Sequence, residues 1–252
     1  MKIQKKIGIL ACEDAPGWGG EQGISNYITK QFGRIEDGVA TEFVHFHAVT
    51  GQLPQEDEIK SFDGFVISGS HYSVNDRHNW IDNLINFVRS LYDLPNRPKL
   101  FGICFGHQLI AKALGGKVEN NSSKRFVWGT EKIELAAPLR VNSLLSRAFG
   151  ERRGHFKIAQ SHGEWVSVLP KEAVCIGRSS SCEHEVLMYG ETIMSTQGHP
   201  ELVKEALVGN ILPRLLDKGI LNAEEERVAL QSLSDEDQYK LIQFVKMFLV
   251  AN

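Results

Sequence analysis

The chain of 252 residues carries 28 basic and 31 acidic side chains, and 42% of its residues are apolar. An apolar share of this size supplies a globular core and argues against intrinsic disorder. The formal net charge of only −3 excludes a protein that binds nucleic acid or an anionic membrane through bulk charge. No segment reaches the roughly 18 apolar residues of a membrane-spanning helix. Together with the balanced charge, this predicts no nucleic-acid or membrane partner, and the use of cysteine discussed below predicts a cytoplasmic protein.

The first apolar run of the chain is Ile7–Ala11, which follows a basic start. A secretion signal needs a longer apolar segment, so we interpret this run as a buried strand. Similar runs alternate with segments of helical spacing, which is the pattern of a parallel sheet with helices on both faces. The further strands expected in the first half are Glu42–His47, Gly64–Ser68 and Lys99–Ile103, with helices around residues 24–32, 81–91 and 109–114.

The pattern changes after Gly115-Gly116, a pair typical of a left-handed helix end. Short strands follow, and then a helix from about Glu201 to Leu216 and a last helix with Ser234 as its expected N-cap. The strands expected here are Lys132–Leu135, Val174–Gly177, Val186–Tyr189 and Thr192–Thr196. We therefore predict an α/β domain over residues 1–202, with a central, mostly parallel sheet, and a C-terminal helical extension over 203–252 packed on it.

Cys104 is flanked by Gly102 and Gly106 where a predicted strand gives way to a predicted helix. This is the nucleophile-elbow pattern with cysteine in place of serine, in which a sharp turn leaves no room for side chains beside the nucleophile. The turn also directs the thiol at the positive end of the helix dipole, which favours the thiolate. The competing interpretation is a buried structural cysteine in a tight turn.

A second candidate segment contains His199 and Glu201 on either side of Pro200. Proline disfavours a helical conformation at the residue before it, so His199 is expected at the extended end of a strand. Glu201 is then expected in the first turn of the next helix. A nucleophilic cysteine needs a general base, and that base needs a carboxylate that orients its ring. The pair completes a candidate triad with Cys104, the alternative being an ordinary strand-to-helix corner.

The motif GICFGHQ, followed by a helix and a glycine pair, and the distant GHPE together resemble the class I (triad-type) glutamine amidotransferases. The resemblance extends over about residues 64–201 and implies that family's flavodoxin-like α/β fold. It implies that Cys104 is the nucleophile, His199 the base and Glu201 the orienting carboxylate. It also implies that Gln108 contacts the bound glutamyl group.

A glycine loop after the third predicted strand matches the same family. Gly69 and Ser70 stand where the family places a backbone N–H that, with the N–H of Phe105, forms an oxyanion hole. The alternative is a plain turn. His71 and His78 are close to this loop in the sequence and are candidates for substrate contact.

The segment SHGEWV also matches the family, at the stretch whose backbone grips the glutamyl end of the substrate. The resemblance therefore implies substrate-binding roles for Ser161, His162 and Gly163. The alternative is a β-turn in which His162 is incidental.

The chain departs from the common family pattern at two places. Ser68-Gly69-Ser70 stands where many members carry Pro-Gly-Gly, and Gly198 stands where a phenylalanine commonly precedes the histidine. The SGS form and the polar residues after it resemble a stand-alone branch that includes plant γ-glutamyl peptidases and GMP-synthase-like proteins. The departures leave the implied mechanism intact, but they weaken the case for assigning the family's usual biosynthetic role to this chain.

The resemblance implies a cysteine-dependent hydrolase that cleaves γ-glutamyl amide bonds, in γ-glutamyl peptides or glutamine, through a glutamyl thioester. The expected partner is a small γ-glutamyl molecule, and neither a metal nor an organic cofactor is expected. The alternative is a glutaminase subunit that delivers ammonia to a separate ATP-dependent synthase, since the chain has no phosphate-binding loop of its own. A binding or regulatory protein on the same fold is a third possibility.

The remaining cysteines predict no metal centre. Cys175 and Cys182, with His184 nearby, are the only set that suggests ligands, and their spacing matches no standard zinc site. Four cysteines without a CxxC pair indicate reduced thiols rather than a disulfide scaffold.

Overall fold

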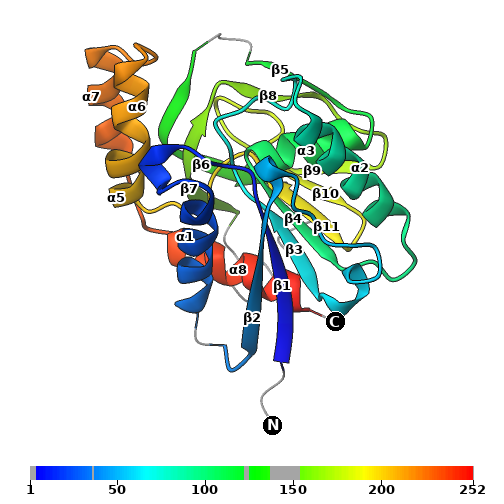
Figure 1. Ribbon diagram of the computed structural model, residues 1–252. Coiled ribbons are helices and arrows are strands. Elements are labelled where there is room, and N and C mark those ends of the chain that lie inside the picture. The colour runs from blue at the N-terminus through cyan, green and yellow to red at the C-terminus, as the bar shows by residue number, and fades with distance from the viewer. Residues whose placement is uncertain (1–3, 36, 122–124, 137–153, 252) are drawn as a thin grey trace.

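The computed structural model describes residues 4–35, 37–121, 125–136 and 154–251. One large sheet forms its centre, and five parallel strands make up one half of this sheet (Figure 1). In spatial order the parallel strands are β2 (Ala40–His47), β1 (Gln4–Ala11), β3 (Gly64–Ile67), β4 (Lys99–Ile103) and β11 (Ile193–Thr196). The central, mostly parallel sheet predicted from the sequence is confirmed, and these five strands form its parallel part.

The other half of the sheet is antiparallel. It continues from β11 through β10 (Val186–Tyr189), β9 (Ala173–Arg178), β6 (Val127–Leu135) and β7 (His155–His162). Two further strands, β5 (Lys117–Asn120) and β8 (Glu164–Val168), form a separate small sheet. Strands β5, β7 and β8 were missed in the sequence, because charged and histidine side chains interrupt their apolar alternation.

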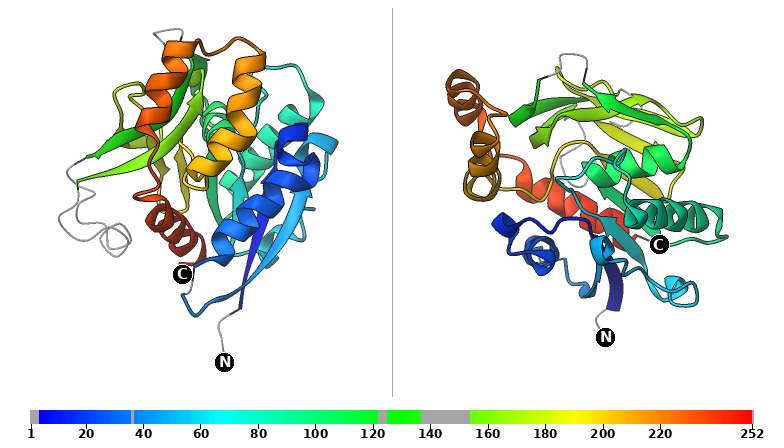
Figure 2. Two further views of the ribbon diagram at one scale, coloured as in Figure 1. Left: turned by 90° about the vertical axis from the view of Figure 1, so that its left-hand side faces the viewer. Right: turned by 45° about the horizontal axis from the view of Figure 1, so that its top comes forward.

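Helices cover both faces of the parallel half. On one face α1 (Glu21–Gly33) and α8 (Gln238–Val250) enclose an apolar cluster with the strands, and Figure 2 shows these two helices, blue and red, side by side. On the other face α2 (Asn79–Asp93) and α3 (Phe105–Ala113) enclose a second cluster. The prediction of helices on both faces is therefore confirmed, and none of the described helices is long and apolar enough to cross a membrane.

The end of α3 has the predicted left-handed glycine. Gly115 has a φ of 97°, its N–H donates to the Lys112 carbonyl, and the N–H of Gly116 donates to the Ala111 carbonyl. This is the Schellman arrangement, which satisfies carbonyls at the helix end. It turns the chain away from the parallel layer into β5.

The helix predicted from about Glu201 begins later than expected. Pro200 and Glu201 form a turn, and the helix begins at α5 (Lys204–Ala206), continues as a π-helical segment (Leu207–Ile211) and ends as α6 (Leu212–Asp217). The Tyr27 hydroxyl donates to the Glu201 carbonyl and accepts from the Val203 N–H. A side chain from α1 thus satisfies backbone groups that an earlier helix start would have used.

The predicted N-cap of the last helix is also wrong. Helix α8 begins at Gln238, and the Ser234 N–H instead donates to the Thr130 hydroxyl of β6. A separate helix, α7 (Ala223–Ser232), precedes this connection and begins with an Asn222–Glu225 capping box. The acidic cluster after Ser234 therefore belongs to a connector.

The apolar stripe of α8 lies inside the domain core. Phe248 is 2% exposed and meets Phe101 of β4 edge-on, with 6.3 Å between ring centroids. The stripe residues buried in the same cluster are Leu241, Ile242, Val245, Phe248 and Leu249. The division of the chain at residue 202 stays a prediction.

Candidate active site

The carboxyl ends of the parallel strands open into a cavity of about 910 Å³. In open α/β sheets this is the edge at which ligands bind. All ten of the residues predicted to form the site line this one cavity: Gly69, Ser70, Cys104, Phe105, Gln108, Ser161, His162, Gly163, His199 and Glu201. The tertiary structure thus brings together segments that lie up to 132 positions apart in the sequence.

Cys104 occupies the sharp turn between β4 and α3. Its φ is 50° and its ψ is −99°, a conformation that non-glycine residues rarely adopt and that marks local strain. A Cβ at Gly102 would lie 2.7 Å from the Gly106 carbonyl, and one at Gly106 would lie 2.5 Å from the Ile67 carbonyl. The two flanking glycines are therefore sterically required, as the elbow pattern predicts.

His199 and Glu201 form a buried pair at the end of β11. The Nδ1 of His199 lies 2.9 Å from Oε1 of Glu201, and the two residues are 7% and 1% exposed. The His199 N–H donates to the Ala159 carbonyl of β7, which holds the backbone extended as predicted. Burial lowers the pKa of His199, but the charges of Glu201 and Cys104 outweigh it and raise that pKa well above 6.5. The pair therefore favours a protonated imidazole beside the thiol.

Gly69 approaches both members of the candidate dyad. A Cβ at this position would lie 2.9 Å from Cε1 of His199 and 3.7 Å from the Cys104 Cβ. On the other side of Cys104, the N–H of Phe105 is in the first turn of α3, where a helix leaves its N–H groups without intrahelical acceptors. The backbone at both positions therefore borders the thiol.

Gln197 contacts the thiol and was missed in the sequence. Its Nε2 donates to the Cys104 Sγ at 3.6 Å, and its Oε1 accepts from Gln108 Nε2 at 3.1 Å. Gln108 Nε2 also donates to the Glu164 carbonyl at 2.9 Å. The available signal was the alternation of an extended strand end, which puts residues 197 and 199 on one side of the chain.

The segment around His162 lies where the chain passes from β7 in the large sheet to β8 in the small one. Ser161 reaches the thiol through its carbonyl, which accepts from Cys104 Sγ at 3.8 Å. The Nδ1 of His162 donates to the Glu164 carbonyl, and burial lowers the pKa of His162 to about 4. His162 is therefore neutral, and it is only 3% exposed. It is the last residue of β7, and Gly163 links the large sheet to the small one.

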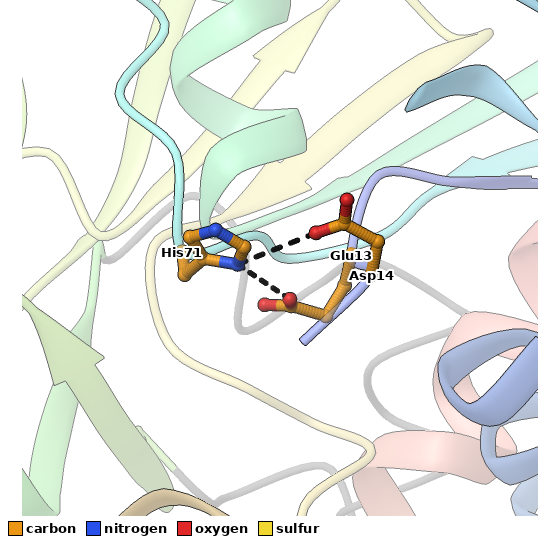
Figure 3. A group of neighbouring side chains, drawn as sticks. All are labelled: Glu13, Asp14 and His71. Carbon is orange, nitrogen blue, oxygen red and sulfur yellow. Dashed lines mark hydrogen bonds and ion pairs between the residues drawn. The ribbon is translucent and has the colours of Figure 1, made fainter. Parts of the chain in front are cut away.

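The outer wall of the cavity carries Glu13, Asp14 and His71, drawn in Figure 3. His71 Nδ1 lies 2.6 Å from Glu13 Oε1 and 3.9 Å from Asp14 Oδ1. Within the described part of the chain, this is the one group of three side chains close enough together to hold a metal ion. His78 does not line the cavity, and it meets the Tyr72 ring edge-on.

The two other cysteines considered as ligands do not form such a group among the described residues. Cys175 donates to the Glu183 carbonyl at 3.2 Å, and Cys182 is 1% exposed. Both thiols are free.

Comparison with known proteins gives a consistent result. The model of the family described as glutamine amidotransferase class-I matches residues 22–216. Gamma-glutamyl peptidase 3 of Arabidopsis thaliana is 32% identical over 80% of this chain and 78% of its own. A glutamine-hydrolysing GMP synthase of Tolumonas auensis is 26% identical over 64% of this chain and 30% of its own.

The solved structures agree on the fold. A glutamine amidotransferase of Thermotoga maritima superposes with a TM-score of 0.71 at 16% identity, with both chains fully covered. The likeness in fold and the family match therefore point the same way. The chain belongs to the glutamine amidotransferase class-I family.

Proposed function

We propose that this protein hydrolyses γ-glutamyl amide bonds, with Cys104 as nucleophile, His199 as proton carrier and Glu201 as the carboxylate that orients the imidazole. The observation that carries the proposal is the buried His199–Glu201 pair, 2.9 Å apart, in the same cavity as the strained elbow cysteine. The relatives named gamma-glutamyl peptidase support this substrate class.

In the first half-reaction the Cys104 thiolate attacks the γ-carbonyl carbon of the substrate. The backbone N–H groups at Gly69 or Ser70 and at Phe105 stabilise the oxyanion. As the tetrahedral intermediate collapses, the C–N bond breaks and His199 gives its proton to the departing amine. A glutamyl thioester on Cys104 and a neutral imidazole remain.

In the second half-reaction the neutral imidazole takes a proton from water, and the hydroxide attacks the thioester carbon. The C–S bond breaks, glutamate leaves, and the thiolate–imidazolium pair is restored. Gln108 and the 161–163 segment hold the glutamyl end throughout. No step needs a metal or an organic cofactor.

A glutaminase subunit that supplies ammonia to a separate ATP-dependent synthase is the second candidate. The observation in its favour is that this chain matches only 30% of the Tolumonas GMP synthase, whose own chain continues beyond the matched part. We favour the free-standing hydrolase because the cavity volume of about 910 Å³ is near the top of the range for small-ligand pockets. A leaving amino acid or peptide would occupy much of this volume, whereas the ammonia released from glutamine would occupy little of it.

Two attributes accompany the proposal. We propose that residues 203–252 are an extension of the domain formed by residues 1–202, because α8 buries its apolar stripe against that domain. We also propose a cytoplasmic location, because the reaction needs a free thiol and reducing compartments keep thiols free.

Glutamate release by the purified chain tests the proposal. Wild type is expected to hydrolyse γ-glutamyl dipeptides without a partner, and Cys104→Ser to lose several orders of magnitude in kcat. Cys175→Ser, which changes a partly buried thiol outside the cavity lining, serves as the matched control and should keep its activity. Near wild-type turnover by Cys104→Ser would refute the nucleophile. Activity that appears only with an added ATP-dependent synthase would favour the second candidate.

A further inference from the structure

The cavity extends beyond the candidate triad into a chamber whose walls come from opposite ends of the chain. One wall is the loop after β1, residues 13–18, and the other is the π-helical segment with α6. The two walls touch, since a Cβ at Gly17 would lie 3.1 Å from the Asn210 carbonyl. The π-helix is a rare element, and where one is found it is frequently at a functional site.

The acidic wall of this chamber is satisfied by neighbouring side chains. Glu13 Oε1 accepts from the Ala15 N–H at 2.7 Å and lies 2.6 Å from His71 Nδ1, as Figure 3 shows for the side-chain pair. Asp14 accepts from the Tyr72 hydroxyl at 3.3 Å. These carboxylates therefore already have donors, and the wall does not call for a cationic ligand.

The opposite wall presents positive charge without such partners. Arg214 on α6 is partly buried and lines the cavity, and none of the described residues lies within hydrogen-bond or ion-pair distance of its guanidinium. Lys218, one turn further, also lines the cavity without a described partner, and Asp217 beside it is beyond ion-pair distance of both. A partly buried guanidinium with five unused donors is a site for a planar anion.

Arg214 lies on α6, whose buried residues Leu212 and Leu215 belong to one apolar cluster with Trp128 of β6 and Ala159 of β7. Burial and Asp14 raise the pKa of Tyr72 while the Arg214 charge lowers it, which puts the guanidinium within electrostatic range of the loop after β3. In the sheet, β1 and β3 lie on one side of β4, and β11 and β7 lie on the other. Gln108, the residue expected to contact the glutamyl group, donates to the Glu164 carbonyl at the start of β8, whereas Tyr72, which senses the Arg214 charge, follows β3 on the other side of β4.

We propose that Arg214, assisted by Lys218, binds the carboxylate of the leaving amino acid in a γ-glutamyl substrate. The inference rests on the proposed hydrolysis of γ-glutamyl bonds and names its substrate class as γ-glutamyl amino acids and peptides. Glutamine leaves ammonia, which has no carboxylate, so this contact discriminates between the two kinds of substrate.

Three substrates test the assignment in wild type and Arg214→Ala. Glutamine and γ-glutamyl ethylamide have no carboxylate on the leaving group, whereas γ-glutamylglycine has one. Arg214→Ala is expected to lower kcat/KM for γ-glutamylglycine about ten- to hundredfold, mainly through KM, because a charge-assisted contact is lost. The other two substrates should change by no more than about twofold, and Arg214→Lys should recover part of the loss.

Arg227→Ala, which removes an exposed arginine on α7 paired with Glu224, is the matched control and should leave all three substrates unchanged. Circular dichroism and thermal unfolding establish that each variant is folded. An equal loss of kcat/KM on all three substrates would show that Arg214 holds the glutamyl carboxylate instead. An unchanged kcat/KM for γ-glutamylglycine would show that Arg214 does not bind this substrate. Either result overturns the inference while wild type stays active. A wild type inactive on all three substrates would instead refute the proposed function.

Discussion

The side-chain amide of Gln197 donates to the Sγ of Cys104 at 3.6 Å, and the same amide accepts from Gln108 on its oxygen. A hydrogen-bond chain therefore connects the thiol with the residue expected to contact the glutamyl group. Gln197 is fully buried, so its amide is held in place. A donor aimed at sulfur stabilises the thiolate more than the thiol.

Gln197→Met, which keeps the length of the side chain but removes the donor, should lower kcat about tenfold to a hundredfold. The rate of Cys104 alkylation by iodoacetamide at a fixed neutral pH should fall, because the donor to the sulfur is lost. Gln231→Met, at an exposed position of α7, is the control. An unchanged alkylation rate would contradict this role of Gln197.

Gly69→Ala should damage catalysis while leaving the fold intact. The new Cβ would lie 2.9 Å from His199 Cε1, so the ring must move away from the thiol. We expect a fall in kcat of about a hundredfold, because small misplacements of reacting groups are costly. Gly33→Ala, where a Cβ meets nothing within 4 Å, provides the control. Wild-type kcat in a folded Gly69→Ala protein would show that the close approach is unimportant.

Glu201→Gln should lower the pKa of His199, because the variant removes the charge that most strongly opposes the effect of burial. A raised histidine pKa stabilises the fold below about pH 6.5, and that stabilisation is lost as pH rises through the folded-state value. The unfolding free energy of the variant should therefore fall short of wild type most clearly near pH 6. Histidine NMR titration measures the pKa directly.

The same variant should retain more activity than His199→Ala, since Glu201 orients the ring and His199 carries the proton. His199→Ala is expected to lose about 10⁴-fold in kcat, comparable to losing the nucleophile. A harsher effect of Glu201→Gln, in a folded protein, would reverse the two roles.

Glu185 predicts a pH dependence of stability. Its carboxylate is fully buried, accepts from Gln160 and Ser179, and has a pKa raised by burial to about 7. The pKa of Glu185 is higher in the folded protein than in the unfolded chain. The unfolding free energy is therefore highest below pH 4.5 and falls by about 3 kcal/mol as the pH rises to 7.

Glu185→Gln should therefore flatten the fall in unfolding free energy between pH 4.5 and 7, as measured by urea titrations. The exposed Glu172→Gln is the control and should follow the wild-type curve. A wild-type curve without this fall would contradict the raised pKa. The Gln197 N–H donates to the Glu185 carbonyl, so the residue also supports the strand end behind the thiol.

Phe248→Ala should cost about 3–5 kcal/mol of unfolding free energy, the usual effect of removing a buried aromatic ring. The ring is 2% exposed and packs edge-on against Phe101 of β4. Tyr239→Ala, 43% exposed on the same helix, should change stability by no more than about 0.5 kcal/mol. Equal effects of the two substitutions on the unfolding free energy would show that the packing of Phe248 on Phe101 contributes little to the stability of the domain.

The local sequence was sufficient wherever a feature depends on neighbouring residues. Gly102 and Gly106 predict the elbow at Cys104 because their missing side chains are required by the turn itself. Apolar runs predict β1, β3 and β4, since strands buried on both faces need continuous apolar residues. Pro200 predicts the extended backbone at His199 through steric exclusion of the helix.

Contacts between distant segments decided the rest. The Tyr27 hydroxyl donates to the Glu201 carbonyl ahead of the helix, and the Thr130 hydroxyl accepts from the Ser234 N–H. Neither Tyr27 nor Thr130 can be identified as a partner from the residues near Glu201 or Ser234 in the sequence. Gln197 reaches Cys104 only because β11 pairs with β4. Nearby residues therefore specify the reactive groups and the local turns that present them. Which of these groups meet depends on the packing of strands and helices far apart in the chain, because that packing sets the distances between them.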